Sequence, residues 1–277
     1  MQFFNKKPFF LTVSALSAAA VFLRFLELGF NIEEHTGFYK NQLSFSRIVF
    51  IIIVALAFIS GFLLLRHIKS RAKLPVNLKF DFSSFFSEKL LFAIITVGFA
   101  VNTFYEFFRL ANPFSTLILQ RGSDTFAVLT TIASTLCLVF FIVLCVLSEP
   151  KKIGSSLACT VVVIWAVLRI LRDFISFTTI LYVSKNLIDI IYLSALVFTL
   201  FSFCRLIADD SNKKSFKVFT VFAPITILLG FVVSVPSILG FICGFDSIGE
   251  SDMFMHFVDL TLSFFLLRFS MHLYSEK

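Results

Sequence analysis

Charged and amide side chains recur at helical spacing inside apolar stretches of this 277-residue sequence. Asn102, Glu106 and Arg109 are spaced i, i+4 and i+7, so they share one face of a helix. Arg169 and Arg172, three residues apart, occupy another apolar stretch in the same way. On neighbouring helices such groups would either line a site for a polar solute or neutralise one another as ion pairs.

Further charges accompany these stripes. Arg24 and Glu27 lie one turn apart in the first apolar stretch, and Asp173 and Asp189 follow Arg172 along the chain. The nearly balanced signs favour interhelical ion pairs about as strongly as a binding cavity. The candidate solute-binding or ion-pairing residues are therefore Arg24, Glu27, Asn102, Glu106, Arg109, Arg169, Arg172, Asp173 and Asp189.

The longest polar stripe lies near the C-terminus and comprises Asp252, His256, Asp259, Ser263, Ser270 and Tyr274. We expect it to face other helices or water, because a central Asp exposed to lipid costs about 2.5 to 3.5 kcal/mol. Arg268 projects from nearly the opposite side. His256 and Asp259 form a candidate proton relay, since histidine changes its charge near neutral pH.

Catalytic and metal-binding motifs are missing from the sequence, which contains no HExxH, GxSxG, Walker or GxGxxG pattern. Asp252, His256 and Asp259 would supply metal ligands from one helix, without a second ligand-bearing helix beside them. The five cysteines show no CxxC spacing and suit packing rather than disulfides or zinc. We therefore expect neither an enzyme nor a bound metal or cofactor.

The elements that position these residues are expected to be membrane helices. Hydrophobic residues make up 58% of the chain, charged residues 15%, and the mean hydropathy is +0.95. A soluble domain of this length has too little interior to bury so much apolar surface. Runs of about 20 apolar residues can cross a bilayer as helices. Eight such runs predict an all-α integral membrane protein: Phe9 to Phe30, Ile48 to Leu65, Leu90 to Leu110, Phe126 to Leu147, Ser155 to Leu171, Leu187 to Ile207, Val218 to Leu239 and Phe254 to Tyr274.

The distribution of basic residues predicts the threading. If the chain forms four helical hairpins that start and end in the cytoplasm, the inner segments hold 16 of the 24 Lys and Arg residues. The positive-inside rule therefore favours cytoplasmic N- and C-termini. The +7 net charge is then a threading signal and implies no nucleic-acid partner. The absence of an Asn-X-Ser/Thr sequon favours a bacterial plasma membrane.

Three local patterns leave alternatives open. Ser17 to Ala20 resembles a secretory cleavage site, but apolar residues continue to Leu23, which favours a retained helix. The sequence segments 90–147 and 153–207 align without gaps. This alignment fits a repeated hairpin and chance matches in a chain with 41 Phe residues about equally well. Pro224 and Pro236 predict kinks, either in a bent packing helix or in a moving gate.

Two functions fit these patterns. The leading hypothesis is a multipass membrane protein that binds or transports a small polar or charged solute through an outward-facing polar cavity. The alternative is a noncatalytic membrane subunit or scaffold whose intramembrane charges are structural. The expected partners are the lipid bilayer and a small polar solute, or a second copy of the chain, another membrane subunit or an ATPase subunit; no nucleic acid is expected.

Overall fold

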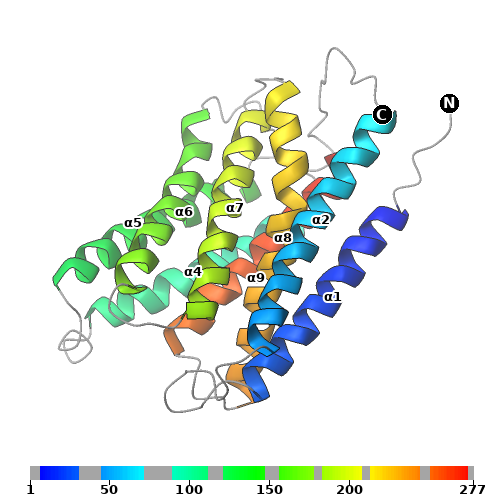
Figure 1. Ribbon diagram of the computed structural model, residues 1–277. Coiled ribbons are helices and arrows are strands. Elements are labelled where there is room, and N and C mark those ends of the chain that lie inside the picture. The colour runs from blue at the N-terminus through cyan, green and yellow to red at the C-terminus, as the bar shows by residue number, and fades with distance from the viewer. Residues whose placement is uncertain are drawn as a thin grey trace.

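The computed structural model describes residues 7–30, 45–71, 89–111, 121–146, 156–177, 183–207, 213–243 and 250–273. Across these ranges the chain forms eight α-helices and no strand, which confirms the all-α prediction. The helices are α1 (Lys7–Phe30), α2 (Phe45–Arg71), α4 (Lys89–Ala111), α5 (Arg121–Val146), α6 (Ser156–Phe177), α7 (Val183–Ile207), α8 (Lys213–Ile242) and α9 (Glu250–Leu273), as Figure 1 shows.

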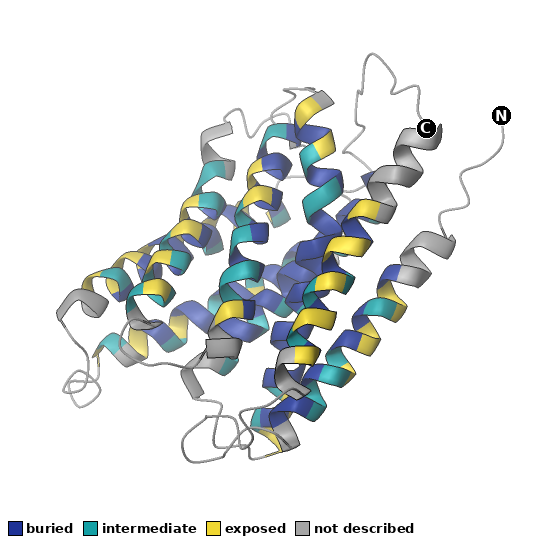
Figure 2. Cartoon of the chain, in the orientation of Figure 1, coloured by how far each residue is buried: buried dark blue, intermediate teal, exposed yellow. Residues whose placement is uncertain are grey.

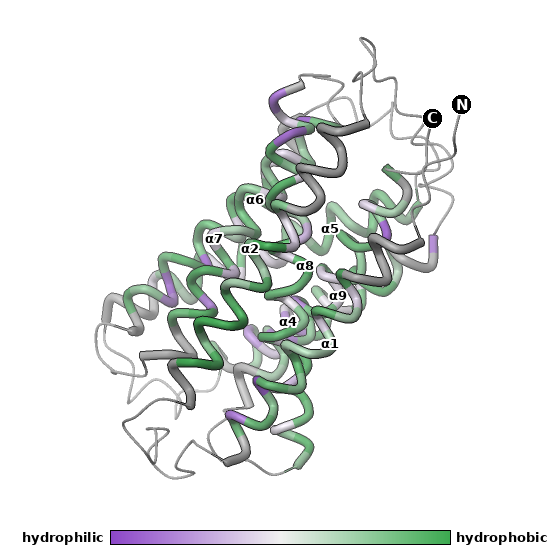
Figure 3. Tube along the Cα trace, turned by 45° about the vertical axis from the view of Figure 1, so that its right-hand side comes forward, coloured by the Kyte–Doolittle hydropathy of each residue, from purple (hydrophilic) through white to green (hydrophobic). Residues whose placement is uncertain are grey.

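Four of these helices are long and apolar enough to cross a membrane. Their apolar spans are Thr125–Val146 in α5, Leu187–Leu206 in α7, Lys214–Ile242 in α8 and Met253–Met271 in α9. Two shorter apolar segments, Ile48–Phe62 and Phe92–Phe108, lie in α2 and α4. Figure 3 shows the same character, with apolar residues along most of each helix and a few hydrophilic positions within the helices. The chain is therefore a transmembrane protein.

Six of the helices form a closed ring of contacts. Each helix from α4 to α9 contacts the next one, and α9 also contacts α4, so these six helices close on themselves. The α1 and α2 helices pack against each other and against α8. Figure 2 shows α8 and α9 largely buried and the outer faces of the surrounding helices exposed. The interior helices α8 and α9 therefore hold the bundle together.

The α8 helix runs without a break through Pro224 and Pro236. It contacts α1, α2, α7 and α9, and most of its apolar span is buried. A proline removes one backbone donor from the helix, but packing on several sides can hold such a helix in place. The position of α8 among four neighbours fits a packing helix.

An aromatic cluster fills one part of the interior, and its members are Phe92, Phe141, Phe203, Phe219, Phe265 and Phe269. Phe265 of α9 makes edge-to-face contacts with Phe92, Phe141 and Phe203, at centroid separations of 5.7, 6.3 and 5.4 Å. These three rings come from α4, α5 and α7, and Phe269 adds Phe219 of α8. Edge-to-face geometry is the favoured arrangement of paired rings, so the cluster joins five helices by packing alone.

Two glycines bring α9 close to its neighbours. A Cβ atom on Gly98 of α4 would lie 2.7 Å from Thr261 Oγ1, and one on Gly230 of α8 would lie 2.0 Å from Ser263 Oγ. Both distances are shorter than any van der Waals contact. Small residues allow such close approach between membrane helices, so α9 is held between α4 and α8 at Thr261 and Ser263.

Candidate functional site

A buried ion pair joins α6 to α9. Both terminal nitrogens of the Arg169 guanidinium donate to the carboxylate of Asp259: Nη1 to Oδ1, and Nη2 to Oδ2 at 2.7 Å. Arg169 is 4% exposed and Asp259 is fully buried. Two parallel hydrogen bonds between a planar guanidinium and a carboxylate fix both distance and orientation. The pair therefore sets how α6 and α9 face each other.

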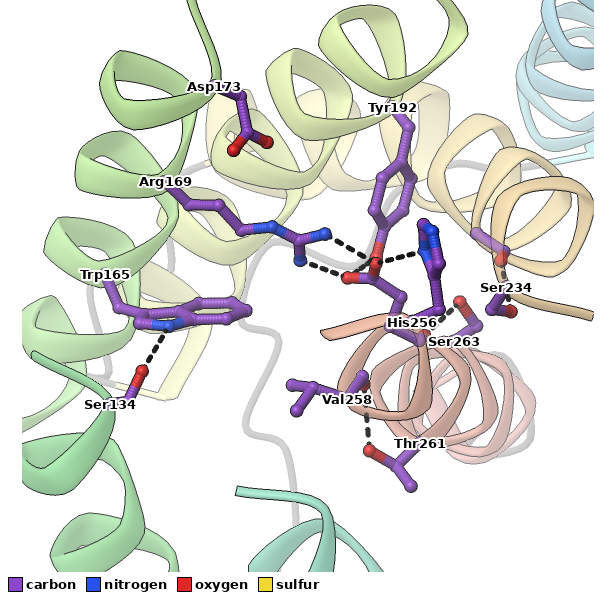
Figure 4. A network of polar contacts seen from close by, with 12 residues as sticks. Ser134, Trp165, Arg169, Asp173, Tyr192, Ser234, His256, Val258, Thr261 and Ser263 are labelled. Atoms are coloured by element: carbon purple, nitrogen blue, oxygen red, sulfur yellow. Dashed lines mark hydrogen bonds and ion pairs between the residues drawn. The ribbon is translucent and has the colours of Figure 1, made fainter. Parts of the chain in front are cut away.

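Two more side chains reach the same carboxylate. The Tyr192 hydroxyl of α7 donates to Asp259 Oδ1 at 3.1 Å, and His256 Nδ1 lies 3.6 Å from Asp259 Oδ2. We call Arg169, Tyr192, His256 and Asp259 the polar network. Figure 4 shows Arg169, Tyr192 and His256 converging from α6, α7 and α9. Within the apolar bundle, Asp259 thus has a charged partner and a neutral donor on separate helices.

Trp165 supports the guanidinium one turn earlier on α6. Its ring centroid lies 5.7 Å from the Arg169 guanidinium carbon, and its indole N–H donates to Ser134 of α5 at 2.9 Å. Phe99 of α4 packs edge to face on the same indole at a centroid separation of 5.0 Å. An arginine over an aromatic ring gains a favourable interaction with the ring face. Trp165 is held by Ser134 of α5 and Phe99 of α4, and it therefore positions the Arg169 guanidinium.

A second ion pair links α4 to α6. Arg172 Nη1 lies 3.1 Å from Glu106 Oε1, and Arg172 Nε lies 3.4 Å from Asp173 Oδ1. The side chain of Arg172 is 17% exposed, whereas that of Glu106 is 3% exposed. The sequence offered Asp173 and Asp189 as nearby acids for Arg172, and Asp173 is a partner, but the partner on another helix is Glu106. The polar face of α4 that carries Glu106 and the polar face of α6 that carries Arg172 therefore belong to one region of the bundle.

The charges of α1 form a separate pair. Arg24 Nη1 lies 2.5 Å from Glu27 Oε2 in the same helix, and both side chains are buried. The α1 helix packs against α2 and α8, and Figures 1 and 3 place it on the opposite side of the bundle from α6. Arg24 thus pairs with Glu27 within one helix, whereas the sequence had suggested ion pairs between helices.

Several buried polar atoms of α4, α6 and α9 make no hydrogen bond within the described part of the chain. Asn102 is 1% exposed, yet neither its Nδ2 nor its Oδ1 has a partner there. The same holds for Arg169 Nε and for both ring nitrogens of His256. Buried polar atoms are almost always hydrogen-bonded, because each unpaired one costs about 1 to 3 kcal/mol. These atoms therefore require an occupant or another role.

The remaining predicted residues are placed only in part. The side chains of Arg109 and Asp252 lie outside what the structure describes, as does Tyr274. Asp189 is half-buried in the first turns of α7. The described members of the C-terminal stripe (His256, Asp259, Ser263 and Ser270) are buried, and Arg268 is exposed, which confirms that the stripe faces other helices.

The pairing of Arg169 with Asp259, and the part played by Tyr192, were missed from the sequence. Periodicity shows which residues share a helix face, but it does not show which faces meet. Tyr192 carries no charge and stands alone in an apolar run, so its single signal is a hydroxyl deep in a predicted span.

Among the described residues, no three His, Cys, Asp or Glu side chains gather as metal ligands. The proton-relay role of His256 and Asp259 stays a prediction, as does the hairpin repeat. No protein-family model, curated protein or solved structure matches the chain. Its function must therefore be inferred from the geometry of the polar network and its surroundings.

Proposed function

We propose that the chain crosses the plasma membrane of a bacterium eight times, as four hairpins with both termini in the cytoplasm. The eight helices provide the crossings. In Figure 1, α1 begins and α9 ends at the same end of the bundle, as an even number of crossings requires. The excess of basic residues in the inner segments favours the cytoplasm for that end.

Within this topology, we propose that the protein binds or transports a small polar solute at the polar network. The observation that supports this function most directly is Asn102, a buried carboxamide with no hydrogen-bond partner among the described residues, one helical turn before Glu106, which pairs with Arg172. Intramembrane polar side chains are costly in lipid and commonly mark solute or ion pathways. A solute that supplied the missing hydrogen bonds would offset the cost of burying Asn102.

The proposed route opens to the outer side. Asp259 lies in the N-terminal half of α9, and the proposed threading directs this half outward. Arg172, in the last two turns of α6, is half-buried and lies farther toward the same side than Arg169. A solute entering from outside would therefore meet the Arg172–Glu106 pair before it reached Asn102.

The second candidate function is a noncatalytic membrane subunit or scaffold. It is favoured by the pairing of the buried charges, since Arg24 contacts Glu27, Arg169 contacts Asp259 and Glu106 contacts Arg172. Such pairs fix the rotation of helices and require no ligand. In that case the basic inner segments would contact anionic lipid or a cytosolic partner.

Mass spectrometry of the gently purified protein distinguishes the two functions. Binding predicts a small molecule that co-purifies reproducibly, whereas a scaffold predicts a stoichiometric protein partner and no solute. A purified protein with a partner subunit and no small molecule would overturn the binding function.

Cysteine labelling tests the threading. Single cysteines at Lys73, Lys152 or Lys213 in a cysteine-free background should resist an impermeant thiol reagent in intact cells, whereas cysteines at Lys40 or Glu250 should react. Permeabilised cells provide the control, because all five positions should then react. Labelling of the first group in intact cells would contradict the proposed orientation.

A further inference from the structure

Contacts on both sides of Asn102 fix its level relative to α9. Gly98, one turn earlier on α4, abuts Thr261, and Tyr105, about one turn later, stacks on Phe254 at a centroid separation of 4.4 Å. The two helices are therefore antiparallel here, and Asn102 lies at the level of α9 between Phe254 and Thr261. This segment contains Asp259.

Two further contacts fix Asn102 relative to α6. Phe99 packs on Trp165, and Glu106 pairs with Arg172, so residues 66 positions apart lie at the same level on these parallel helices. Asn102 shares the face of Phe99 and Glu106 and falls between them. Its level on α6 is that of Arg169, whose Nε–H also lacks a hydrogen bond within the described ranges. Asn102 and Arg169 therefore lie at nearly the same level on α4 and α6, and the level of Asn102 on α9 is that of the segment that contains Asp259.

The charges at this place cancel. Arg169 and Asp259 neutralise each other through two hydrogen bonds, and the atoms left without a hydrogen bond among the described residues include the Arg169 Nε–H, the two ring nitrogens of His256 and the two polar ends of the Asn102 amide. These ends offer donors and one acceptor without surplus charge. Because the ion pair leaves no net charge, an anion or a cation would gain little net attraction there to recover the cost of its own desolvation.

We propose that Asn102 and the Nε–H of Arg169 bind a small uncharged molecule through a hydroxyl or carboxamide group, which both donates and accepts hydrogen bonds. This inference rests on the proposed solute-binding function and specifies its ligand class. A trapped water molecule has the same hydrogen-bonding chemistry and would satisfy the same atoms. The experiment therefore has to separate a solute from water.

The test uses Asn102→Leu, which keeps the approximate shape of the side chain and removes its hydrogen bonds. Thr199→Val is the matched control, because Thr199 is buried on α7 and bonds Thr226 of α8, away from Asn102. Wild-type protein and both variants are purified gently, and co-purifying small molecules are identified by mass spectrometry. Asn102→Leu should lose an uncharged solute at least tenfold, whereas Thr199→Val should retain it.

Thermal unfolding supplies a second reading. In extensively washed protein, Asn102→Leu should raise the Tm by about 2 to 4 °C, because it removes an unpaired buried amide. Acetamide should then raise the Tm of the wild type more than that of Asn102→Leu, whereas acetate should shift both equally. A fall in the Tm of washed Asn102→Leu would show that Asn102 already has protein partners and would overturn the inference.

The outcomes separate this inference from the function on which it rests. A charged solute that depends on Asn102 would overturn the ligand class and keep the binding function. A solute retained by Asn102→Leu would overturn the site and keep the function. If no solute accompanies the wild type and acetamide has no Asn102-dependent effect, the amide holds only water, and both proposals fail.

Discussion

The α9 helix carries two centres of interhelical contact only six residues apart, and they hold the bundle by different means. At Asp259, the polar network joins α6 and α7 to α9 through hydrogen bonds. At Phe265, the aromatic cluster joins α4, α5 and α7 through ring packing. The Asp259 carboxylate has few partners, and its hydrogen bonds have fixed directions. The Phe265 ring packs on several rings at similar centroid separations.

The difference concerns specificity. Lipid chains are as apolar as phenylalanine, so ring packing in a membrane gains mainly shape complementarity, and another set of large side chains can supply that. A buried arginine has no substitute for its carboxylate, because an unpaired charge in the bundle is strongly unfavourable. The aromatic cluster therefore fills the interior, whereas the polar network selects which faces of α6, α7 and α9 meet.

Breaking the ion pair should have the largest effect on stability. Asp259→Asn keeps the shape of the side chain but leaves the Arg169 charge uncompensated, so we expect the free energy of unfolding to fall by about 3 to 5 kcal/mol. Reversible unfolding in mixed micelles measures the change. Combining Asp259→Asn with Arg169→Gln should restore most of the loss, because the pair is then neutral. Equal losses in the single and double variants would contradict the dominance of the charge.

Opening the aromatic cluster should cost somewhat less. Phe265→Ala leaves a cavity bounded by Phe92, Phe141 and Phe203, and we expect the free energy of unfolding to fall by about 3 kcal/mol. Phe265→Leu should recover more than half of this loss, since no direction is required of the replacement. Phe104→Ala is the control, because Phe104 is 76% exposed and should change stability little. If Phe265→Leu lowered the free energy of unfolding as much as Phe265→Ala, the aromatic cluster would be as selective for its side chains as the polar network at Asp259.

The glycine contacts lie between the two centres and connect them. Gly230→Ala places a methyl group against Ser263, so we expect a loss of about 2 kcal/mol through separation of α8 from α9. Ser263→Ala removes the hydroxyl that the methyl meets first, so the double variant should be more stable than Gly230→Ala alone. Thermal unfolding of the three variants measures this coupling. Additive losses would show that the helices separate for another reason.

The weakest effect is expected at the half-buried pair. Arg172→Gln removes the charge facing Glu106, but the proposed threading places this end of α6 near the outer surface, where water and salt would screen the 17% exposed arginine. We expect a loss of about 1 kcal/mol, which added salt should reduce. The Asp259→Asn loss should be nearly independent of salt, because Arg169 and Asp259 are buried. The same salt dependence at both pairs would place them in the same environment.

The positions of the helices were predictable because apolar runs near 20 residues are distinctive. The predicted Leu187 to Ile207 corresponds to α7, Val183–Ile207. At α6 the prediction fell short, because the helix was expected to end at Leu171 but continues to Phe177. The apolar run stops at Arg172 and Asp173, whereas the helix continues because these charges have partners across the bundle and within it.

The polar network was predictable only one helix at a time. Helical spacing correctly placed Asp259 and Ser263 on a buried face. The partner of Asp259 lies 90 residues earlier in the chain, and nothing in the spacing of one helix specifies its neighbour. Tyr192 was not anticipated, because a lone tyrosine in an apolar run gives no periodic signal.

The long separation between Arg169 and Asp259 has a consequence for how the protein is made. Synthesis proceeds at about 5 to 20 residues per second, so under the proposed threading α6 enters the membrane about 5 to 20 s before Asp259 leaves the ribosome. During that time the Arg169 guanidinium and the Tyr192 hydroxyl lack the carboxylate that they bind in the finished bundle. A nascent chain with an unpaired intramembrane arginine is a substrate for insertion factors and for membrane quality control. The carboxylate partner of Arg169 therefore arrives only with α9, and a chain truncated before α9 should be degraded rather than accumulate.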